Sequence, residues 1–317
     1  LKDFGERISI NNQLIEKKYV VDFVKNNNKI FEELNMSFFE MTVALAFDYF
    51  AEKKVDIAVI EVGLGGRLDS TNIIIPEISI ITNISLDHTN LLGDKIEDIA
   101  KEKAGIIKPS VPIIVGRYQE KTKKIFYQTA KKNKSKLIYS KILFQYSNFT
   151  DYQEENINTS ICAIKELKKI GWKISKKQIN KGIDTAMNKN PIKGRWQVLS
   201  SKPKIICDTA HNYDGFKKVL IEINKVKFES LHFVLGMVND KKIDDILNIL
   251  PKKATYYFCK AKIERGIDEK LLAKKAQNLN GKTYDSVKKA LDHAKKNAKK
   301  NDLIFVGGST FTVAEII

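Results

Sequence analysis

Short apolar runs alternate along the chain with longer segments in which apolar residues recur every three or four positions. The first pattern is typical of buried strands and the second of amphipathic helices. In the first half of the chain, the apolar runs predict strands at 55–61, 78–83 and 112–115. The periodic segments predict helices at 37–53, 94–104, 119–132 and 156–170.

The second half repeats this alternation after an interruption. Pro191 and Gly194 break the pattern in NKNPIKGRW, residues 188–196, and the break predicts a domain boundary after residue 190. Beyond it, strands are expected at KIIC, LHFVLGM, TYYFCKA and DLIFVGG. Helices are expected from residue 213, at 241–250, and twice before the last strand.

Strands that alternate with helices indicate parallel sheets covered by helices. The sequence therefore predicts an α/β protein of two domains. Residues 1–190 form a parallel-sheet domain, and residues 191–317 form a smaller Rossmann-like domain with its own sheet. Pattern and spacing alone go no further than a nucleotide-binding protein of this architecture.

Two predicted helices carry end signals. Ser37 and Glu40 have the spacing of a capping box at the start of the helix at 37–53, which gives Glu40 a structural explanation. Asp94 is placed to cap the helix at 94–104, and Gly105 is placed to end it.

The 317-residue chain has no apolar run of the roughly 20 residues needed to span a bilayer, and it opens without a signal peptide. A cytoplasmic protein is therefore expected. Cys162, Cys207 and Cys259 are far apart and form no C-x-x-C pair. The sequence thus predicts core thiols rather than a disulfide framework or a zinc ribbon.

The formal net charge of +17 raises the question of nucleic-acid binding. Most of the charge is lysine in helical stretches such as KKALDHAKKNAKKND, and no nucleic-acid-binding module accompanies it. A solvated lysine-rich surface explains this pattern, and attraction of polyanionic ligands is the alternative.

Polar side chains occur where three predicted strands end: Glu61 after VDIAVI, Asp87 and His88 after ITNISL, and Asp208 with His211 after KIIC. Ligands of open α/β sheets collect at the carboxyl ends of the strands, and carboxylate and imidazole groups suit a divalent cation. A carboxylate at the end of a core strand also needs a positive partner. Taken alone, a Glu or His at a strand end more often has a structural role, hydrogen-bonded to a loop or a helix end.

Lys103 continues the apolar stripe of Ile96, Ile99 and Ala100 and should therefore point inward, whereas Lys101 lies off that stripe. An inward lysine can extend its amine to solvent or form an ion pair. Alternatively, burial lowers its pKa, and the neutral amine takes up carbon dioxide to give an anionic carbamate that can join a metal site. The pattern does not choose between these.

Seven stretches follow one another with consistent spacing: EVGLGGRLDSTNII, LDHTNLLG, IAKEKAGIIK, GRWQ, DTAHN, GMVNDKKI and ERGIDEKLL. In that order they resemble motifs of the folylpolyglutamate synthase/dihydrofolate synthase family of the Mur ligase superfamily. The resemblance covers essentially the whole chain. It implies that residues 1–190 form an incomplete P-loop-type ATPase domain and that residues 191–317 form the glutamate ligase domain.

The implied activity is that of an ATP-dependent amide ligase. The γ-phosphate of ATP passes to a carboxylate of dihydropteroate or a folate, and the amino group of L-glutamate attacks the resulting acyl phosphate. The implied cofactors are ATP and two Mg²⁺ ions, and the implied partners are these small molecules only. A monomer that binds neither nucleic acid nor membrane is expected.

Site residues follow from their positions in the matching motifs. Glu61 would bind the first Mg²⁺ and His88 the second, while Lys103 would be the carbamylated lysine of the metal site. With Arg195, which would contact the ATP phosphates, His88 and Lys103 form the implied catalytic set. This reading gives Glu61 the positive partner that its position requires, and phosphoryl transfer needs little beyond positioning and neutralisation of charge.

Further residues carry implied binding roles. Asp208 would contact the ATP ribose, and Asn156 of a looser Q-x-x-N pattern and His211 would touch the nucleotide. Two segments would line the site of the pterin substrate: Ser37, Phe38, Phe39 and Glu40, and Leu68, Asp69 and Ser70.

The chain departs from the family in one respect. The family's phosphate loop, of the form G-T-N-G-K-G-S, and a serine Mg²⁺ ligand in S-P-H-L precede a stretch like LKDFGERISINN, with which this chain begins. The expectation is an N-terminally truncated ligase that binds ATP poorly and turns over negligibly.

Two alternatives stay open. Another Mur-superfamily ligase would act on a peptidoglycan precursor or a cyanophycin-like substrate, although EVGLGGRLDSTN has the form of the folate branch. A basic α/β nucleic-acid-binding protein would explain the charge but would leave the seven motifs unexplained.

Overall fold

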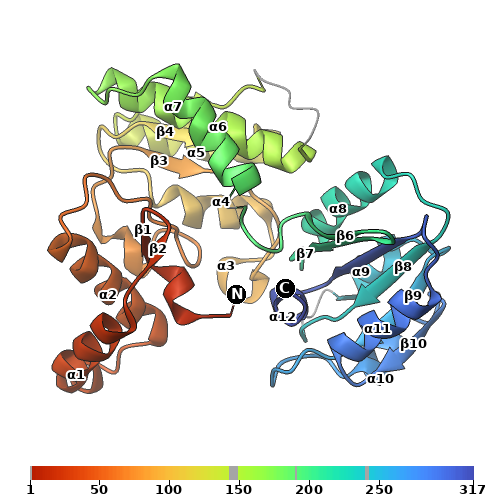
Figure 1. Ribbon diagram of the computed structural model, residues 1–317. Helices are drawn as coiled ribbons and strands as arrows, with labels where there is room; N and C mark the ends of the chain where they lie inside the picture. The colour runs from red at the N-terminus through yellow and green to blue at the C-terminus, as the bar shows by residue number, and fades with distance from the viewer. Residues whose placement is uncertain (1, 143–148, 190, 240–242) are drawn as a thin grey trace. The chain divides into compact units, whose positions relative to one another are not determined.

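Two compact units make up the chain in the computed structural model, which describes residues 2–142, 149–189, 191–239 and 243–317 (Figure 1). The N-terminal unit comprises Lys2–Lys141 and Cys162–Gly171, and the C-terminal unit comprises Ile142–Ile161 and Trp172–Ile317. Residues 172–189 thus cluster with the C-terminal unit, whereas the sequence predicts a boundary after residue 190, and that boundary stays a prediction. Residue 190, and residues 241 and 242 of the predicted helix at 241–250, lie outside the described residues.

The N-terminal unit has a three-stranded parallel sheet in the order β3-β4-β5. Its strands are β1 (Ser9–Ile10), β2 (Gln13–Leu14), β3 (Ser79–Ile81), β4 (Ile113–Val115) and β5 (Leu137–Tyr139), of which β1 and β2 form a separate hairpin. Its α-helices are α1 (Lys17–Glu33), α2 (Phe38–Glu52), α3 (Thr89–Leu92), α4 (Ile96–Ala104) and α5 (Glu120–Lys132), and its short 3₁₀ helices are η1 (Phe4–Arg7) and η2 (Ser70–Ile73). Helix α6 (Asp151–Lys169) is divided between the two units.

The strand predicted at 55–61 is wrong, because these residues form no strand. A strand needs a neighbouring backbone to receive its hydrogen bonds, and within the described residues the sheet ends at β3, with β4 as its partner. Ile57 and Val59 are 47% and 95% exposed. The apolar run is therefore uncovered, and Glu61 ends an exposed segment rather than a core strand.

The two helix-end predictions have different outcomes. The capping box is confirmed, since the amide of Glu40 donates to Ser37 Oγ at 3.2 Å and the amide of Ser37 donates to Glu40 Oε2 at 2.7 Å. The cap predicted at Asp94 is wrong, because α4 begins at Ile96 with Lys95 as its cap residue, and Lys95 has no side-chain acceptor.

The C-terminal unit is built on a six-stranded sheet in the order β10-β9-β8-β11-β7-β6, parallel except for β6. Its strands are β6 (Gln197–Ser201), β7 (Lys204–Asp208), β8 (Leu231–Leu235), β9 (Thr255–Cys259), β10 (Gly281–Tyr284) and β11 (Leu303–Gly307). Its helices are α7 (Lys176–Asp184), the π-helical turn η3 (Thr185–Lys189), α8 (Tyr213–Lys225), α9 (Ile243–Ile249), α10 (Glu269–Lys275), α11 (Val287–Asn297) and α12 (Thr310–Ala314). The predicted α/β class with parallel sheets is confirmed.

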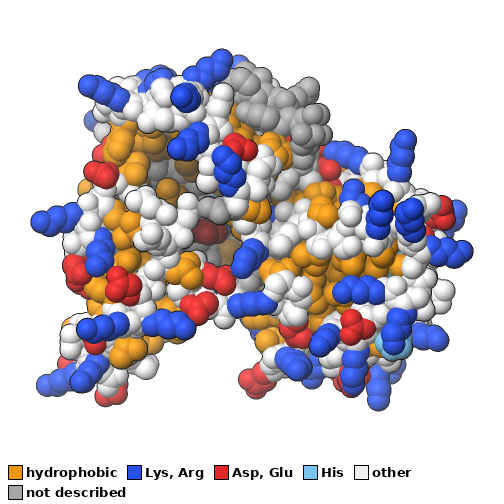
Figure 2. All heavy atoms as spheres, in the orientation of Figure 1, with side chains coloured by type: hydrophobic (Ala, Val, Ile, Leu, Met, Phe, Trp, Pro, Cys, Tyr) orange, Lys and Arg blue, Asp and Glu red, His pale blue; other side chains and the backbone are white. Residues whose placement is uncertain are grey.

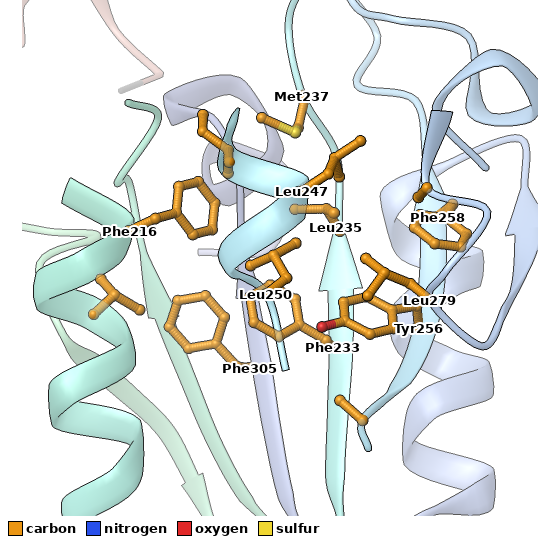
Figure 3. Close-up of a cluster of buried hydrophobic side chains, with 14 of the residues drawn as sticks. Phe216, Phe233, Leu235, Met237, Leu247, Leu250, Tyr256, Phe258, Leu279 and Phe305 are labelled. Atoms are coloured by element: carbon orange, nitrogen blue, oxygen red, sulfur yellow. The ribbon is translucent and has the colours of Figure 1, made fainter. Parts of the chain in front are cut away.

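Aromatic side chains fill one face of this sheet, beneath α8 and α9 (Figure 3). Phe233 packs against Tyr256 and Phe305 at centroid distances of 5.4 and 4.9 Å, and all three are fully buried. Burying such a side chain contributes about 1.5 to 3 kcal/mol. The other face is covered by α11 and α12, so the sheet forms a rigid base for the loops at its carboxyl edge.

Lysine and arginine side chains are dispersed over the face in view rather than gathered in one patch (Figure 2). Among the described residues, no helix is both long and apolar enough to cross a membrane.

Candidate functional site

The glycine-rich loop after Glu61 is packed against the end of α4. The amide of Arg67 donates to the carbonyl of Glu102 at 2.8 Å, and the Arg67 guanidinium pairs with the Glu102 carboxylate at 3.0 Å. A Cβ at Gly66 would lie 2.8 Å from the Glu102 carbonyl oxygen, and one at Gly105 would lie 2.4 Å from Arg67 Cα. Two motifs that are far apart in sequence are therefore in backbone contact, which only glycine permits.

Asp69 holds the turn of this loop. Its carboxylate accepts hydrogen bonds from the amide of Leu64 at 2.8 Å and from the amide and hydroxyl of Thr71 at 3.0 and 2.5 Å. These bonds are a structural role for Asp69, and its predicted contact with the pterin substrate stays a prediction.

Lys103 lies inward, as predicted, and Lys101 is exposed and paired with Asp98 at 3.0 Å. Burial lowers the pKa of the half-buried Lys103 amine, against the opposing charges of Asp87 and Asp69. Within the described part of the chain, the Lys103 amine has no carboxylate within ion-pair distance. Desolvation therefore favours the neutral amine that carbamylation requires, and it outweighs the two carboxylates, whose charges favour the protonated form.

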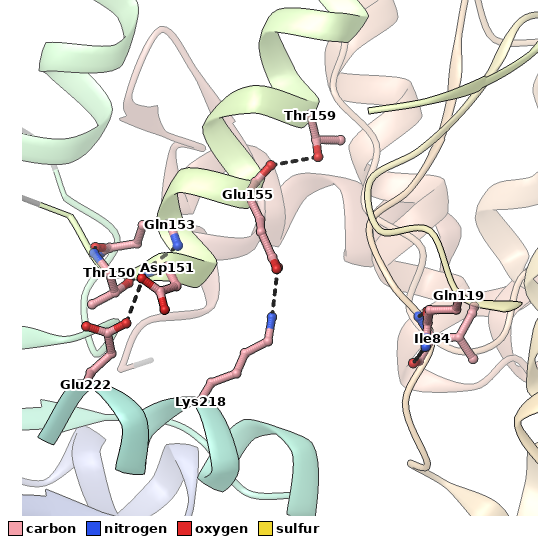
Figure 4. A network of polar contacts seen from close by, with 9 residues as sticks. All are labelled: Ile84, Gln119, Thr150, Asp151, Gln153, Glu155, Thr159, Lys218 and Glu222. Atoms are coloured by element: carbon pink, nitrogen blue, oxygen red, sulfur yellow. Dashed lines mark hydrogen bonds and ion pairs between the residues drawn. The ribbon is translucent and has the colours of Figure 1, made fainter. Parts of the chain in front are cut away.

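His88 follows Asp87 in the loop after β3, in a left-handed backbone conformation with φ of 48°. Its amide donates to Asp87 Oδ1 at 2.8 Å, and its exposed imidazole lies 3.9 Å from the same atom. Ile84, at the start of the same loop, forms two hydrogen bonds of 2.8 Å through its backbone with the side-chain amide of Gln119 (Figure 4). Gln119 therefore anchors the loop that carries His88.

The predicted metal ligands differ in how closely the structure associates them with one another. Lys103 lies near Asp87, the neighbour of His88. The loop that begins after Glu61 packs on α4, the helix of Lys103. The Glu61 carboxylate is exposed and makes no hydrogen bond or ion pair in the described part of the chain. Nor do three His, Cys, Asp or Glu side chains cluster as a metal site among the described residues. A site built from Glu61, His88 and Lys103 would need the carbamate as its third anionic or imidazole donor.

The first predicted substrate segment packs on the glycine-rich loop that leads to the second. A Cβ at Gly63 would lie 2.3 Å from the ring of Phe39, so this ring is packed on the glycine-rich loop. Phe38 and Leu68 are 58% and 79% exposed. The hydrogen bonds that Glu40 forms with Ser37 in the capping box lower the pKa of the Glu40 carboxyl.

In the C-terminal unit, Asp208 ends β7 and is 3% exposed. Its Oδ2 accepts from the Tyr152 hydroxyl at 2.9 Å and the Trp196 amide at 2.8 Å, and its Oδ1 accepts from the Ala210 amide at 2.9 Å. Burial raises the pKa of Asp208, against these bonds and the charge of Arg195. Asp208, the predicted ribose ligand, therefore also has a structural role, because it links Tyr152, Trp196 and Ala210.

The other predicted nucleotide residues are exposed: Arg195, Asn156 and His211. The Arg195 guanidinium lies close enough to Asp208 for its charge to oppose the raised pKa of that carboxyl. His211 Nδ1 lies 3.1 Å from the carbonyl oxygen of Thr209. Helix α6 begins at Asp151, earlier than the predicted residue 156, so its first turn carries Tyr152.

Sequence reasoning missed two residues with clear roles in these loops. Gln119 was the first residue of a predicted helix, a position that allows a side-chain hydrogen bond to the preceding loop. Tyr152 directly precedes the Q-x-x-N pattern, but no sequence signal indicates its bond to Asp208.

Comparison with protein-family models gives two matches. The Mur ligase middle domain matches residues 9–180, and the Mur ligase glutamate ligase domain matches residues 194–310. The dihydrofolate synthase/folylpolyglutamate synthase of Escherichia coli strain K12 is 31% identical over 99% of this chain and 76% of its own length. The chain belongs to the folylpolyglutamate synthase/dihydrofolate synthase family of Mur ligases.

Other members of this family align over nearly the whole chain. The enzyme of the same name from Buchnera aphidicola subsp. Schizaphis graminum is 30% identical over 100% of this chain and 79% of its own length. A probable bifunctional folylpolyglutamate synthase/dihydropteroate synthase from Haloferax volcanii is 29% identical over 99% of this chain, which spans 41% of that longer protein.

Solved structures of the family have the same fold. Escherichia coli FolC in complex with DHPP and ADP has a TM-score of 0.90 and 27% identity, covering 99% of this chain and 78% of that chain. A bifunctional folylpolyglutamate synthase/dihydrofolate synthase with Mn, AMPPNP and L-glutamate bound has a TM-score of 0.86 and 26% identity, covering 100% of this chain and 79% of that chain. The family and ligase class predicted from the motifs are confirmed, and these bound molecules agree with the predicted use of ATP and a divalent metal ion.

Proposed function

We propose that this chain catalyses, or is part of an enzyme that catalyses, ATP-dependent addition of L-glutamate to dihydropteroate or a folate. In the first step a substrate carboxylate oxygen attacks the γ-phosphorus of ATP and ADP leaves. In the second, the glutamate nitrogen attacks the acyl carbon, phosphate leaves, and the nitrogen loses a proton. The observation that carries the proposal is the docking of EVGLGGRLDSTN on the end of α4, beside the desolvated Lys103.

A divalent metal ion, Mg²⁺ in the prediction, suits the donors of the N-terminal unit. The Glu61 carboxylate, the His88 imidazole and a carbamate on Lys103 would hold it, and it would supply positive charge against the ATP phosphates. The carbamate form is supported by the lowered pKa of the amine. The binding of two ions stays a prediction.

The remaining roles are proposed from the motifs and the local geometry. The exposed Arg195, between Gly194 and Trp196, would stabilise the negative charge of the phosphates. Asp208 would accept a hydrogen bond from a ribose hydroxyl through Oδ1. Asn156 and His211 would complete the contacts with the nucleotide. The segments 37–40 and 68–70, whose Phe38 and Leu68 side chains are exposed, would contact the pterin.

The proposal extends to partners and location. The chain would be a cytoplasmic monomer that binds small molecules and neither nucleic acid nor membrane.

Calorimetric titration with ATP and Mg²⁺, followed by assays of ADP release, tests this function on the 317-residue chain. ADP release that requires both L-glutamate and dihydropteroate or folate is the expected result, with the product heavier by one glutamyl residue. Release with a UDP-muramyl substrate in place of the pterin would identify another Mur ligase. Retention on DNA that falls steeply with salt, without nucleotide binding, would favour the nucleic-acid alternative.

A further inference from the structure

One buried carboxylate connects three segments of the C-terminal unit. Asp208 accepts from the Tyr152 hydroxyl in the first turn of α6, from the Trp196 amide in GRWQ, and from the Ala210 amide in DTAHN, at 2.8 to 2.9 Å. Each segment also carries a proposed nucleotide-contacting residue: Asn156, Arg195 and His211. The hydrogen bonds of Asp208 therefore fix the relative positions of three parts of the proposed nucleotide site.

The segment after Arg195 has an unfavourable backbone conformation. Trp196 has a φ of 50°, and a bulky residue in the left-handed region is a genuine outlier that costs about 1 to 3 kcal/mol. Its amide donates to Asp208, and Gly194 on the other side of Arg195 is held by the amide of Thr209 at 2.9 Å and the side chain of Gln197 at 2.8 Å. The turn keeps this conformation because the surrounding hydrogen bonds impose it.

Tyr152 controls the geometry of this arrangement. A carboxylate oxygen has two acceptor directions, so Tyr152 and the Trp196 amide together saturate Oδ2, while Oδ1 keeps one direction beside its bond to Ala210. Burial, followed by the charge of Asp208, raises the pKa of Tyr152, so its hydroxyl remains a proton donor. Without this hydroxyl, the carboxylate could rotate away from the Trp196 amide.

We propose that Tyr152 is a positioning residue: through Asp208, it holds the Arg195–Trp196 turn in the conformation that presents the Arg195 guanidinium to the nucleotide phosphates. This inference rests on the proposed function of Arg195. It assigns to Tyr152 a role in nucleotide affinity that does not require contact with the nucleotide.

The test compares Tyr152→Phe with Tyr256→Phe in the full chain. Both remove one hydroxyl that donates a hydrogen bond. Tyr256, however, donates to the carbonyl of Pro251, which precedes the start of β9 and so lies away from the carboxyl ends of the parallel strands. ATP with Mg²⁺ is titrated into the millimolar range, and hydrogen exchange of the Trp196 amide is followed by NMR. Tyr152→Phe should weaken ATP binding about tenfold and accelerate that exchange about tenfold, while Tyr256→Phe should change neither by more than about twofold.

A double variant with Arg195→Ala separates a role through Arg195 from a general effect on stability. If Tyr152 acts through Arg195, adding Tyr152→Phe to Arg195→Ala should weaken ATP binding less than about twofold further. An equal tenfold loss in both backgrounds, or faster exchange with unchanged ATP affinity, would overturn the inference.

A further outcome separates the inference from the proposed function. If the unmodified chain binds no ATP, the proposed function fails and the inference fails with it. If the unmodified chain binds ATP and Tyr152→Phe binds it equally well, only the inference fails. Should Tyr152→Phe fold poorly by circular dichroism, Tyr152→Leu replaces it, since it also removes the hydroxyl and leaves Asp208 unchanged, with the same expected coupling to Arg195→Ala.

Discussion

The two sets of proposed site residues differ in how the protein treats their charged groups. In the C-terminal unit, the Asp208 carboxylate is buried and accepts three hydrogen bonds from the chain. In the N-terminal unit, the Lys103 amine is half-buried without an ion pair in the described part of the chain, and the Glu61 carboxylate is exposed. Burial shifts the pKa toward the neutral form in Asp208 and in Lys103 alike.

The difference separates groups that organise a site from groups that remain available to a ligand. A buried charge without partners is costly, so a chain either satisfies it internally or leaves it to be completed by a bound molecule. Asp208 is of the first kind and can hold a turn in a strained conformation. Lys103 is of the second kind, and its chemistry depends on what joins it.

The largest expected effect is at Lys103. Lys103→Ala should weaken binding of Mn²⁺ in the presence of AMPPNP by about 100-fold or more, because it removes a carbamate ligand. Electron paramagnetic resonance titration measures this affinity. Added bicarbonate should strengthen Mn²⁺ binding by the unmodified chain, and acetate should partly restore binding by Lys103→Ala.

Lys101→Ala is the matched control, since Lys101 is exposed on the same helix and paired with Asp98. It should bind Mn²⁺ as the unmodified chain does. Equal affinities for the two variants would show that Lys103 has a structural role only.

Asp208→Asn is expected to have the next largest effect. The amide group cannot accept from every donor that the carboxylate satisfies, so the free energy of unfolding should fall by about 2 to 3 kcal/mol. The variant should also lose affinity for ATP far more than for L-glutamate. Urea denaturation and calorimetry measure the two quantities.

The exposed Asp245 supplies the control, because Asp245→Asn removes a carboxylate of the same unit that has no hydrogen bond in the described part of the chain. It should change the free energy of unfolding by less than about 0.5 kcal/mol. Equal losses of affinity for ATP and glutamate in Asp208→Asn would remove Asp208 from the nucleotide site.

Gln119→Ala tests the anchoring of the His88 loop. Loss of both bonds to Ile84 should lower the free energy of unfolding by about 1 to 2 kcal/mol. Affinity for Mn²⁺ should fall by no more than about tenfold, less than in Lys103→Ala, since the ligands themselves remain. Gln128→Ala, on the exposed face of the same helix, should leave both unchanged, and a similar loss of Mn²⁺ affinity there would contradict the anchoring role.

The smallest effect concerns the pH dependence of stability. Asp208 has a raised pKa, so its contribution to stability is complete below the ordinary aspartate pKa and declines as pH rises through the folded-state value. Burial also acts to raise the pKa of Asp302, but hydrogen bonds from the Lys299 amide and from His232 at 3.2 Å outweigh it and lower that pKa. The stability due to Asp302 is therefore lost as pH falls through its folded-state value.

The destabilisation caused by Asp208→Asn should consequently be largest at acid pH, and that caused by Asp302→Asn should grow as pH rises. Urea denaturation at several pH values between 3 and 7, roughly the range in which buried carboxyls titrate, measures both slopes. Parallel slopes for the two variants would show that burial acts alike on both carboxyls.

The sequence by itself determined the alternation of strands and helices, the capping box at Ser37, the inward face of α4 and the motifs that identify the family. These features depend on local periodicity, on hydrogen bonds between residues three apart, and on residue types in a fixed order, all of which are written along the chain. Strand 55–61 was predicted wrongly because a strand requires a partner, and partners are not local.

Only the tertiary structure decided which charges are satisfied. The bonds from Tyr152 and Trp196 to Asp208 span 56 and 12 residues, and Gln119 reaches Ile84 across 35 residues. The desolvation of Lys103 likewise depends on a loop folded against its helix from more than thirty residues away. Hydrogen bonding and burial act through distance in space, so the sequence could name the residues of the site but not which of them hold the others in place.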